Sequence, residues 1–226
     1  MSWLFLDFGR GDSALNMALD EALLEHSAGL ATPALRFYGW SEAAATFGYF
    51  QKFAEVERAT PLRPLIRRPT GGGIVPHDTD WTYSVIAPPG HEWHELRAEE
   101  SYRRIHEWIQ AALATLHLET ELALCCKKTV PGQCFAGYEK HDLLWSGRKI
   151  AGAAQRRNKL GLLIQGSVQP LWASIKRADW QGAMRRVAEG RFGISGKDFL
   201  PDAKLLSRAN ELARLKYSQD SYNRRR

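Results

Sequence analysis

The chain contains a run of three consecutive glycines, Gly71–Gly73, between Arg68 and His77. Adjacent glycines lose much chain entropy on folding, so a stable protein rarely keeps three of them without a use. Because glycine has no Cβ, a ligand can approach this backbone closely, and its N–H groups can face an anion or a carbonyl oxygen. The run is neither a Walker loop nor a dinucleotide-binding fingerprint, because the other residues of those motifs are missing. We interpret it as a ligand-binding loop; the alternative is a flexible surface turn.

Cys134, beside Phe135, stands in a loop ahead of a predicted hairpin. Considered alone, a cysteine next to a phenylalanine is more typical of buried packing than of a nucleophile. Basic side chains facing the sulfur would favour the reactive thiolate. The basic residues close to it in the sequence are Lys127, Lys128, Lys140 and His141. The other two cysteines, Cys125 and Cys126, stand at a predicted strand end and are expected to be structural.

Lys149 lies in a predicted extended segment, where it alternates with Ile150. One of these two side chains should therefore face a ligand and the other the core. Residues 151–154 are alanines and a glycine, and they leave room for a slim substrate. A lysine here can polarise a carbonyl group or pair with a phosphate. The alternative is a solvated lysine on the hairpin.

Hydrophobic periodicity predicts the elements that must hold these groups. The predicted strands are 34–40, 45–49, 64–68, 81–87, 119–124, 143–145, 149–154 and 160–168. The predicted helices are 13–27, capped by Asp12 or Ser13, and 99–116, 172–176, 180–189 and 203–216. This order predicts an α+β fold, a mixed β-sheet with flanking helices that lie on one face. We expect one domain over 1–226, with a helical segment at about 171–226 packed on it.

The composition excludes several classes of protein. With 44% hydrophobic and 25% charged residues among 226, the chain is neither disordered nor collagen-like. It has no apolar run long enough to span a membrane and no secretory signal, so a cytoplasmic protein is expected. It has no Cys-x-x-Cys pair and no histidine pair at metal spacing, so no metal site is expected.

The basic residues are unevenly placed. The chain has 31 lysines and arginines against 25 acidic residues, a net charge of +6. A basic strip occupies 145–160, and a second run is Arg224–Arg226. Such clusters can meet nucleic acid, an acidic protein or an anionic cofactor, or form a solvated surface.

Several stretches resemble, in order and spacing, the superfamily of lipoate–protein ligases, octanoyltransferases and biotin–protein ligases. They span roughly residues 13–170 and comprise 16–21, 35–40, 47–51, the Arg-Arg-x-Thr-Gly-Gly-Gly block with its histidine at 67–77, the Gly-Arg-Lys-Ile-Ala-Gly block at 147–157, and 165–167. The resemblance implies the ligase-transferase catalytic fold, an apolar tunnel for an acyl chain, and acyl transfer to a lysine of a carrier domain.

The resemblance also implies roles for individual residues. Lys149 matches the lysine that contacts the acyl carbonyl. The substrate-binding residues it implies are Arg68, Thr70, Gly71, Gly72, Gly73, His77, Gly152, Ala153 and Ala154. Gln165 stands close to where relatives often have a histidine, so any role of that histidine does not transfer.

The loop with Cys134 resembles the cysteine-dependent octanoyltransferases and lipoyl amidotransferases. This branch implies that Cys134 and Lys149 are catalytic and that an octanoyl or lipoyl group passes through a Cys134 acyl-enzyme without a cofactor. An alternative is an ATP-dependent lipoate–protein ligase, which would need ATP and Mg and would act either alone or with a separate accessory subunit, although His141-Asp142 stands where ligases typically carry Asn-Asp. A third alternative is an inactive carrier-binding protein.

The implied partners are carrier proteins. The donor would be an octanoyl-acyl carrier protein or a glycine-cleavage H protein, and the acceptor a lipoyl domain; nucleic acid and membrane are not expected partners. Because these carriers are usually acidic, we expect a basic strip beside the site to bind them. The residues of that strip are Arg148, Arg156, Arg157 and Lys159.

Overall fold

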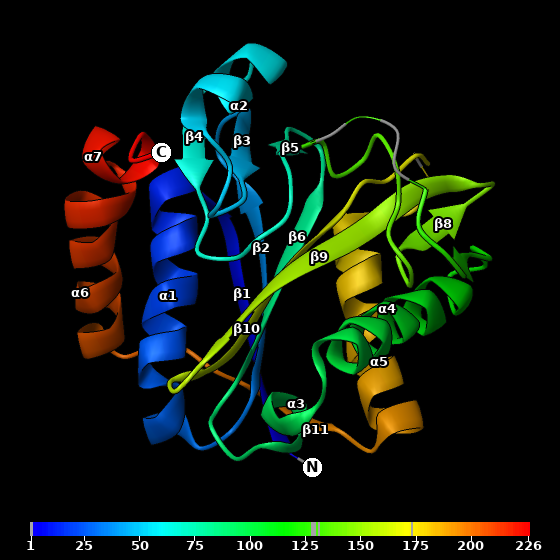
Figure 1. Cartoon of the computed structure of the whole chain (residues 1–226). Coiled ribbons are helices and arrows are strands. Elements are labelled where there is room, and N and C mark those ends of the chain that lie inside the picture. The colour runs from blue at the N-terminus through cyan, green and yellow to red at the C-terminus, as the bar shows by residue number, and fades with distance from the viewer. Residues whose placement is uncertain (1, 128–129, 131, 173) are drawn as a thin grey trace.

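The computed structural model describes residues 2–127, 130, 132–172 and 174–226 (Figure 1). Its strands are β1 (Ser2–Gly11), β2 (Ala34–Trp40), β3 (Ala44–Phe47), β4 (Leu65–Arg67), β5 (Val75–His77), β6 (Trp81–Ala87), β7 (Glu121–Leu122), β8 (Leu143–Trp145), β9 (Arg148–Asn158), β10 (Gly161–Val168) and β11 (Ser195–Asp198). Its helices are α1 (Ser13–Leu30), α2 (Phe53–Ala59), α3 (Glu92–Glu95), α4 (Ala98–Ala114), α5 (Arg177–Phe192), α6 (Ala203–Leu212), the π-helical η1 (Ala213–Tyr217) and α7 (Asp220–Asn223).

Within these residues the strands form two sheets (Figure 1). The large sheet has eight strands in the order β11-β1-β2-β6-β10-β9-β8-β7, and the small sheet has the order β4-β3-β5. Strand β1 is parallel to β11 and β2, whereas neighbours from β2 onward are antiparallel. The small sheet likewise combines a parallel and an antiparallel pair. The predicted α+β class with a mixed sheet is confirmed.

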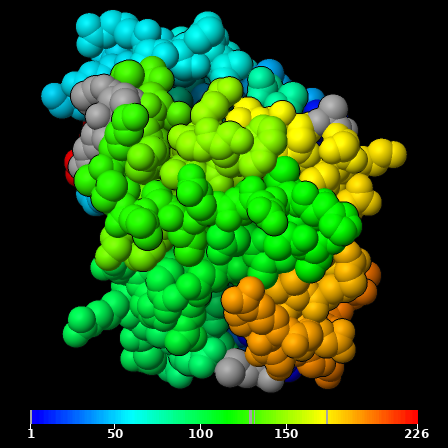
Figure 2. Space-filling model, turned by 90° about the vertical axis from the view of Figure 1, so that its right-hand side faces the viewer, coloured from blue at the N-terminus to red at the C-terminus, as the bar shows by residue number. Residues whose placement is uncertain are grey.

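Helices cover both faces of the large sheet, so the expectation of helices on one face is wrong. Along β2, Leu35 and Phe37 join the core cluster that includes α4 and α5, whereas Ala34 and Tyr38 join the cluster that includes α1 and α6. The central strands β2, β6 and β10 are buried along their whole length, so they have no solvated face. Figure 1 shows α1 and α6 at one side of the sheet, and Figure 2 shows α4 and α5 packed together on another face of the molecule.

The predicted helices 13–27, 99–116 and 180–189 are present with shifted ends. The helix predicted at 13–27 is α1, in which Asp12 is the N-cap and accepts a hydrogen bond of 2.8 Å from the N–H of Leu15. The helix predicted at 99–116 is α4, Ala98–Ala114. No helix in the described ranges combines the length and the apolar composition that crossing a bilayer requires.

The strands differ from prediction mainly at the edges of the large sheet. The predicted 34–40 and 81–87 are β2 and β6, but the predicted 149–154 belongs to a longer β9 of 11 residues. Strand β1 was not predicted. Its Trp3 and Phe5 face one core cluster and its Leu6 the other, so an apolar residue recurs on both faces and no period of two is visible.

The segment 171–226 was predicted as three helices, but it contains a strand and lacks the first of these helices in its described residues. Residues 171–172 and 174–176 form no helix, and residue 173 lies outside the described residues. Helix α5 ends at Gly193, whose φ of 62° is left-handed, and β11 then pairs with β1. The predicted helix 203–216 is α6 followed by η1. The segment therefore supplies a sheet strand as well as helices.

Candidate active site

A pocket lies between the small sheet and strands β2, β6, β9 and β10 of the large sheet. The empty space in it amounts to about 460 Å³, part of which is open to solvent. The two predicted catalytic side chains, Cys134 and Lys149, both line it. The predicted substrate-binding residues that line it are Arg68, His77, Gly152, Ala153 and Ala154. Met17, Trp40 and Val75 give it apolar walls.

The glycine loop holds the sulfur of Cys134. The N–H of Gly73 donates a hydrogen bond of 3.0 Å to Cys134 Sγ, and the N–H of Cys134 donates to the Ile74 carbonyl at 3.2 Å. A Cβ on Gly73 would lie only 2.7 Å from the carbonyl carbon of Gly132. Glycine was predicted to allow a close approach to this backbone. The loop that carries Cys134 makes that approach.

Arg68 is the basic group beside the sulfur. It is buried, and its Nε and Nη2 donate to the Gly71 carbonyl at 3.1 and 2.5 Å. Burial lowers the pKa of Arg68, and the adjacent Cys134 sulfur opposes that shift. The guanidinium of Arg68 therefore places a positive charge beside the sulfur. The sequence signal for Arg68 was its place in the glycine block, but its contact with Cys134 was not predicted.

Of the basic residues close to Cys134 in the sequence, two are turned toward an acidic side chain. Lys140 and His141 face Glu99, with distances of 2.8 and 3.1 Å to its Oε1. Lys127 lines an outer pocket described below, and Lys128 lies outside the described residues. Cys125 and Cys126, expected to be structural, are exposed.

Lys149 is held by a buried carboxylate. Its Nζ lies 2.7 Å from Asp142 Oδ2 and 5.1 Å from the centroid of the Phe135 ring. The side chain is only 7% exposed, which excludes the solvated hairpin lysine. Ile150 is fully buried in the core, so the predicted alternation of the two residues is confirmed. The hydroxyl of Tyr102 donates to Asp142 Oδ1.

Neither a role for Tyr102 nor a contact of Asp142 was predicted from the sequence. The N–H of Glu139 donates to Asp142 Oδ2 at 2.6 Å, which completes the set of donors around this carboxylate. Because Tyr102, Asp142 and Lys149 come from α4, the loop before β8 and β9, only the fold brings them together.

The predicted His77 and Thr70 belong to buried hydrogen-bond networks. His77 contacts Asp80 Oδ2 at 2.9 Å and Thr46 Oγ1 at 2.8 Å, and it stacks on Trp40. Thr70 Oγ1 donates to Gln165 Oε1 at 2.8 Å. His77 and Gln165 line the pocket, whereas neither Thr70 nor Gly71 is among the described residues that do.

A second, outer pocket of about 1300 Å³, including space open to solvent, meets the first at Cys134. Both pockets are lined by Cys134, Lys149 and Ala153, and the outer one also by Gly72 and Gly73. A carbonyl group at the sulfur could therefore have an apolar chain on its inner side and a leaving group on its outer side. Among the described residues, no three His, Cys, Asp or Glu side chains are placed to hold a metal ion.

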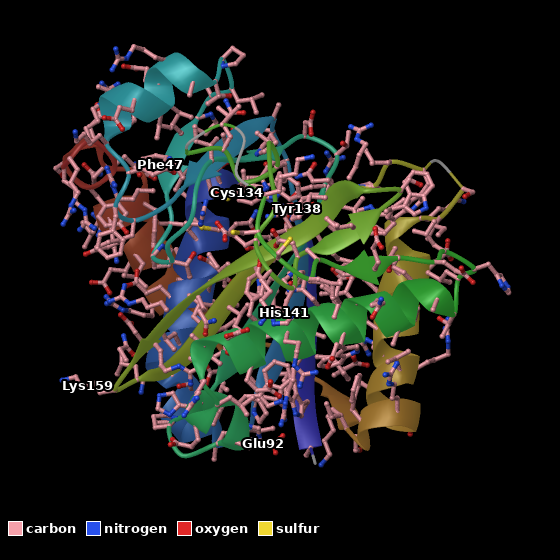
Figure 3. The ribbon with its side chains drawn as sticks, turned by 45° about the vertical axis from the view of Figure 1, so that its right-hand side comes forward. Phe47, Glu92, Cys134, Tyr138, His141 and Lys159 are labelled. Carbon is pink, nitrogen blue, oxygen red and sulfur yellow. The ribbon has the colours of Figure 1, made fainter. Side chains whose placement is uncertain are left out.

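The predicted basic strip does not form one surface, because successive residues of a strand face opposite sides. Arg157 turns toward α3 and α4, where it donates to the Trp93 carbonyl and Ser101 Oγ at 3.3 Å. Lys159 lies at the turn after β9, far from Cys134 (Figure 3). Arg148 is exposed at the opposite end of β9. Arg156 lies close enough to Tyr49 to help lower its pKa.

Comparison with known proteins gives a consistent result. The family model described as lipoyl protein ligase A/B catalytic domain matches residues 12–169. Proteins named octanoyltransferase LipM are 38% identical over 180 residues in Halalkalibacterium halodurans and 37% over 180 residues in Bacillus subtilis. Each alignment covers 74% of this chain and 65% of the relative, so the match spans less than two thirds of those proteins.

The fold also matches solved structures. A putative lipoate protein ligase from T. acidophilum with bound lipoic acid has a TM-score of 0.83 at 22% identity, covering 100% of both chains. A lipoate-protein ligase A bound with ATP has a TM-score of 0.80 at 22% identity, covering 99% of this chain and 98% of that one. At this identity the likeness concerns the fold alone.

Proposed function

Because this chain belongs to the lipoyl protein ligase A/B catalytic domain family, we propose that it is an acyltransferase that moves an octanoyl or lipoyl group through a thioester on Cys134. The observation that carries this proposal is the position of Cys134. Its sulfur lies where an apolar inner pocket meets an outer pocket, with Arg68, Lys149 and the N–H of Gly73 around it. The names of the curated relatives support the octanoyl group.

In the first half-reaction the Cys134 thiolate attacks the carbonyl carbon of a carrier-bound thioester. A new C–S bond forms, the carrier thiolate leaves and takes up a proton, and the acyl group stays on Cys134. Arg68 and the N–H of Gly73 stabilise the attacking sulfur. Lys149 stabilises the negative charge that develops on the carbonyl oxygen. With an amide donor the C–N bond breaks instead, and the leaving amine takes up a proton from solvent; this step is uphill, and amide formation in the second half-reaction offsets it.

In the second half-reaction the neutral amine of an acceptor lysine attacks the thioester on Cys134. The amide bond forms, the amine loses a proton, and the Cys134 thiolate leaves. Thioester exchange is nearly balanced in free energy and amide formation from a thioester is downhill, so neither step needs ATP. The donor would be an octanoyl-acyl carrier protein or a glycine-cleavage H protein, and the acceptor a lipoyl domain.

The inner pocket suits an unbranched acyl chain. Gly152 and Gly166 both line it, and a side chain on either would collide with a neighbour. A Cβ on Gly152 would lie 2.5 Å from Lys149 Cε, so glycine here also makes room for the lysine. The small Ala153 and Ala154 continue the same wall along β9.

The test is intact-protein mass spectrometry after incubation with octanoyl-acyl carrier protein in the absence of ATP. We expect one octanoyl adduct that hydroxylamine removes. Cys134→Ala should abolish it, whereas Cys125→Ser and Cys126→Ser should keep it, because those thiols are exposed and outside both pockets.

Failure to form the adduct would contradict the proposal. If a parallel reaction with ATP, Mg and free lipoate then lipoylated an acceptor, the chain would be a ligase in which Cys134 only packs. If neither reaction proceeded but carriers still bound, it would be an inactive carrier-binding protein.

A further inference from the structure

We propose that Arg156, Arg225 and Arg226, with Tyr49 and Phe50, form the docking surface for the acyl donor, a small acidic carrier protein whose thioester is carried on a phosphate-bearing arm. These five residues are called the arginine patch below. The inference rests on the proposed function and assigns a partner surface to the same site.

The arginine side chains are held in place by the fold. The guanidinium of Arg225 lies 4.0 Å from the centroid of the Tyr49 ring, and that of Arg226 lies 5.5 Å from the Phe50 ring. Their backbone is fixed as well. The N–H of Phe53 donates to the main-chain oxygen of Arg226 at 2.8 Å, and the buried Arg67 donates to the Asn223 carbonyl at 2.9 Å through Nη2.

These arginines carry charge that is available to a partner. In the described part of the chain, neither Arg156, Arg225 nor Arg226 has an ion pair with an acidic side chain. Arg224, by contrast, pairs with Asp220 at 3.3 Å and with Glu57 at 3.9 Å. A hydrogen bond from Arg225 lowers the pKa of Tyr49, and the charge of Arg156 lowers it further.

The arginine patch is linked to the outer pocket through Gln51, the residue that follows Phe50. Gln51 lines that pocket, and its Nε2 donates to the Gly132 carbonyl at 3.1 Å, next to the loop of Cys134. Tyr49 is joined to the glycine loop by a hydrogen bond of 2.9 Å from its N–H to the Thr70 carbonyl. Arg156 is two residues after Ala154 along β9 and so lies on the same face of the strand. A partner on the patch could extend an arm to Cys134.

The chemistry of the patch selects the partner. Phe50 is 70% exposed, and an exposed aromatic ring beside guanidinium groups is typical of protein interfaces rather than of solvated surface. Clustered guanidiniums match an acidic protein surface and bind phosphate well. An acyl carrier protein offers both groups, because its acyl thioester is carried on a phosphodiester-linked arm. An acceptor lysine offers only the acidic surface around it, so the donor fits better.

The patch differs from the basic strip expected from the sequence. Of that strip only Arg156 belongs to it, because Arg157 is turned toward α3 and α4 and Lys159 lies at the far turn (Figure 3). The exposed Lys159 therefore provides a charge control together with Lys204, an exposed residue of α6.

The experiment compares two donors. The rate of Cys134 acylation is measured with octanoyl-acyl carrier protein and with octanoyl-pantetheine, a neutral thioester without phosphate or protein. We expect Arg225→Glu/Arg226→Glu to slow acylation by the carrier about tenfold or more at low salt, with a smaller difference at high salt. Acylation by octanoyl-pantetheine should stay within about twofold of wild type, as should all rates of Lys159→Glu/Lys204→Glu.

Several outcomes would overturn the inference. These are unchanged carrier rates, an equal loss in the Lys159/Lys204 control, or a loss confined to transfer onto the acceptor. If the double charge reversal also slows acylation by octanoyl-pantetheine, the variant Arg225→Gln/Arg226→Gln is measured with both donors. If that variant is slow with both donors, the arginines support the fold, and the docking role is overturned. Failure of wild type with both donors would instead refute the proposed function.

Discussion

Substitution of Gly73 by alanine tests whether the glycine loop activates Cys134. A Cβ on Gly73 would lie 2.7 Å from the Gly132 carbonyl carbon, whereas ordinary contacts begin at about 3.4 Å. The obstacle is backbone, so the two loops must separate by about 0.7 Å or more. That movement acts directly on the hydrogen bond of 3.0 Å from the Gly73 N–H to Cys134 Sγ.

The expected loss follows from the strength of that bond. A hydrogen bond to a charged group contributes about 1.5–3 kcal/mol. Because each 1.4 kcal/mol corresponds to about a factor of ten in rate, Gly73→Ala should slow acylation of Cys134 by about ten- to hundredfold. The neighbouring Gly71 offers a matched control, because a Cβ there meets no atom within 4 Å and its φ is not left-handed. Gly71→Ala should acylate at nearly the wild-type rate.

The assay is single-turnover acylation by octanoyl-pantetheine, followed by mass, with thermal unfolding recorded for each variant. Equal rates for Gly73→Ala and Gly71→Ala would refute the reasoning, because the loop contact would then not matter to the sulfur. A loss that merely tracked a fall in Tm would assign Gly73 to stability alone.

Three further outcomes are expected. Tyr102→Phe should lower kcat about fivefold with little change in Tm, because it removes one hydrogen bond of about 1 kcal/mol from the Asp142 carboxylate that holds Lys149. Steady-state kinetics would measure this loss, and an unchanged kcat would show that Tyr102 does not position Lys149. Gly166→Ala should destabilise the fold by about 1–3 kcal/mol, because its Cβ would collide with the buried Tyr83 ring. Gly29→Ala should not, because a Cβ there meets no atom within 4 Å. Urea unfolding compares the two variants, and equal stabilities would contradict the predicted collision with Tyr83. Burial lowers the pKa of His106 from 6.5 to about 4, so between these pH values the unfolded chain binds a proton that the folded chain does not bind. The free energy of unfolding should therefore be highest above pH 6.5 and fall by about 3 kcal/mol as the pH drops to 4. His106→Gln should reduce this pH dependence, which urea unfolding at several pH values would measure.

The sequence was sufficient for elements whose signals are local. Asp12 caps α1 through its own neighbour Leu15, and the alternation of Lys149 with Ile150 follows from strand geometry. Strand β11 had no such signal. Its residues Ser195–Asp198 are all exposed, and they form a strand only because β1, from the other end of the chain, offers them a partner.

The site was predictable as a set of residue types but not as a set of contacts. The sequence by itself determined where the backbone could come close, at Gly71–Gly73, and which side chains could react, Cys134 and Lys149. Only the tertiary structure decided what surrounds them. Gly73 and Cys134 are 61 residues apart, yet they share a hydrogen bond. Arg68, rather than a basic residue near in sequence, lies beside the sulfur.

The same distinction separates the predicted basic strip from the arginine patch. A strand turns Arg156 and Arg157 to opposite sides, so adjacency in sequence cannot place them on one surface. Arg225 lies over the Tyr49 ring because Arg67 binds α7 and Phe53 binds Arg226. Electrostatic partners act through space, and the distance between two charges is set by packing. Local sequence therefore determines the chemistry each side chain can do, and the fold decides which of them act together.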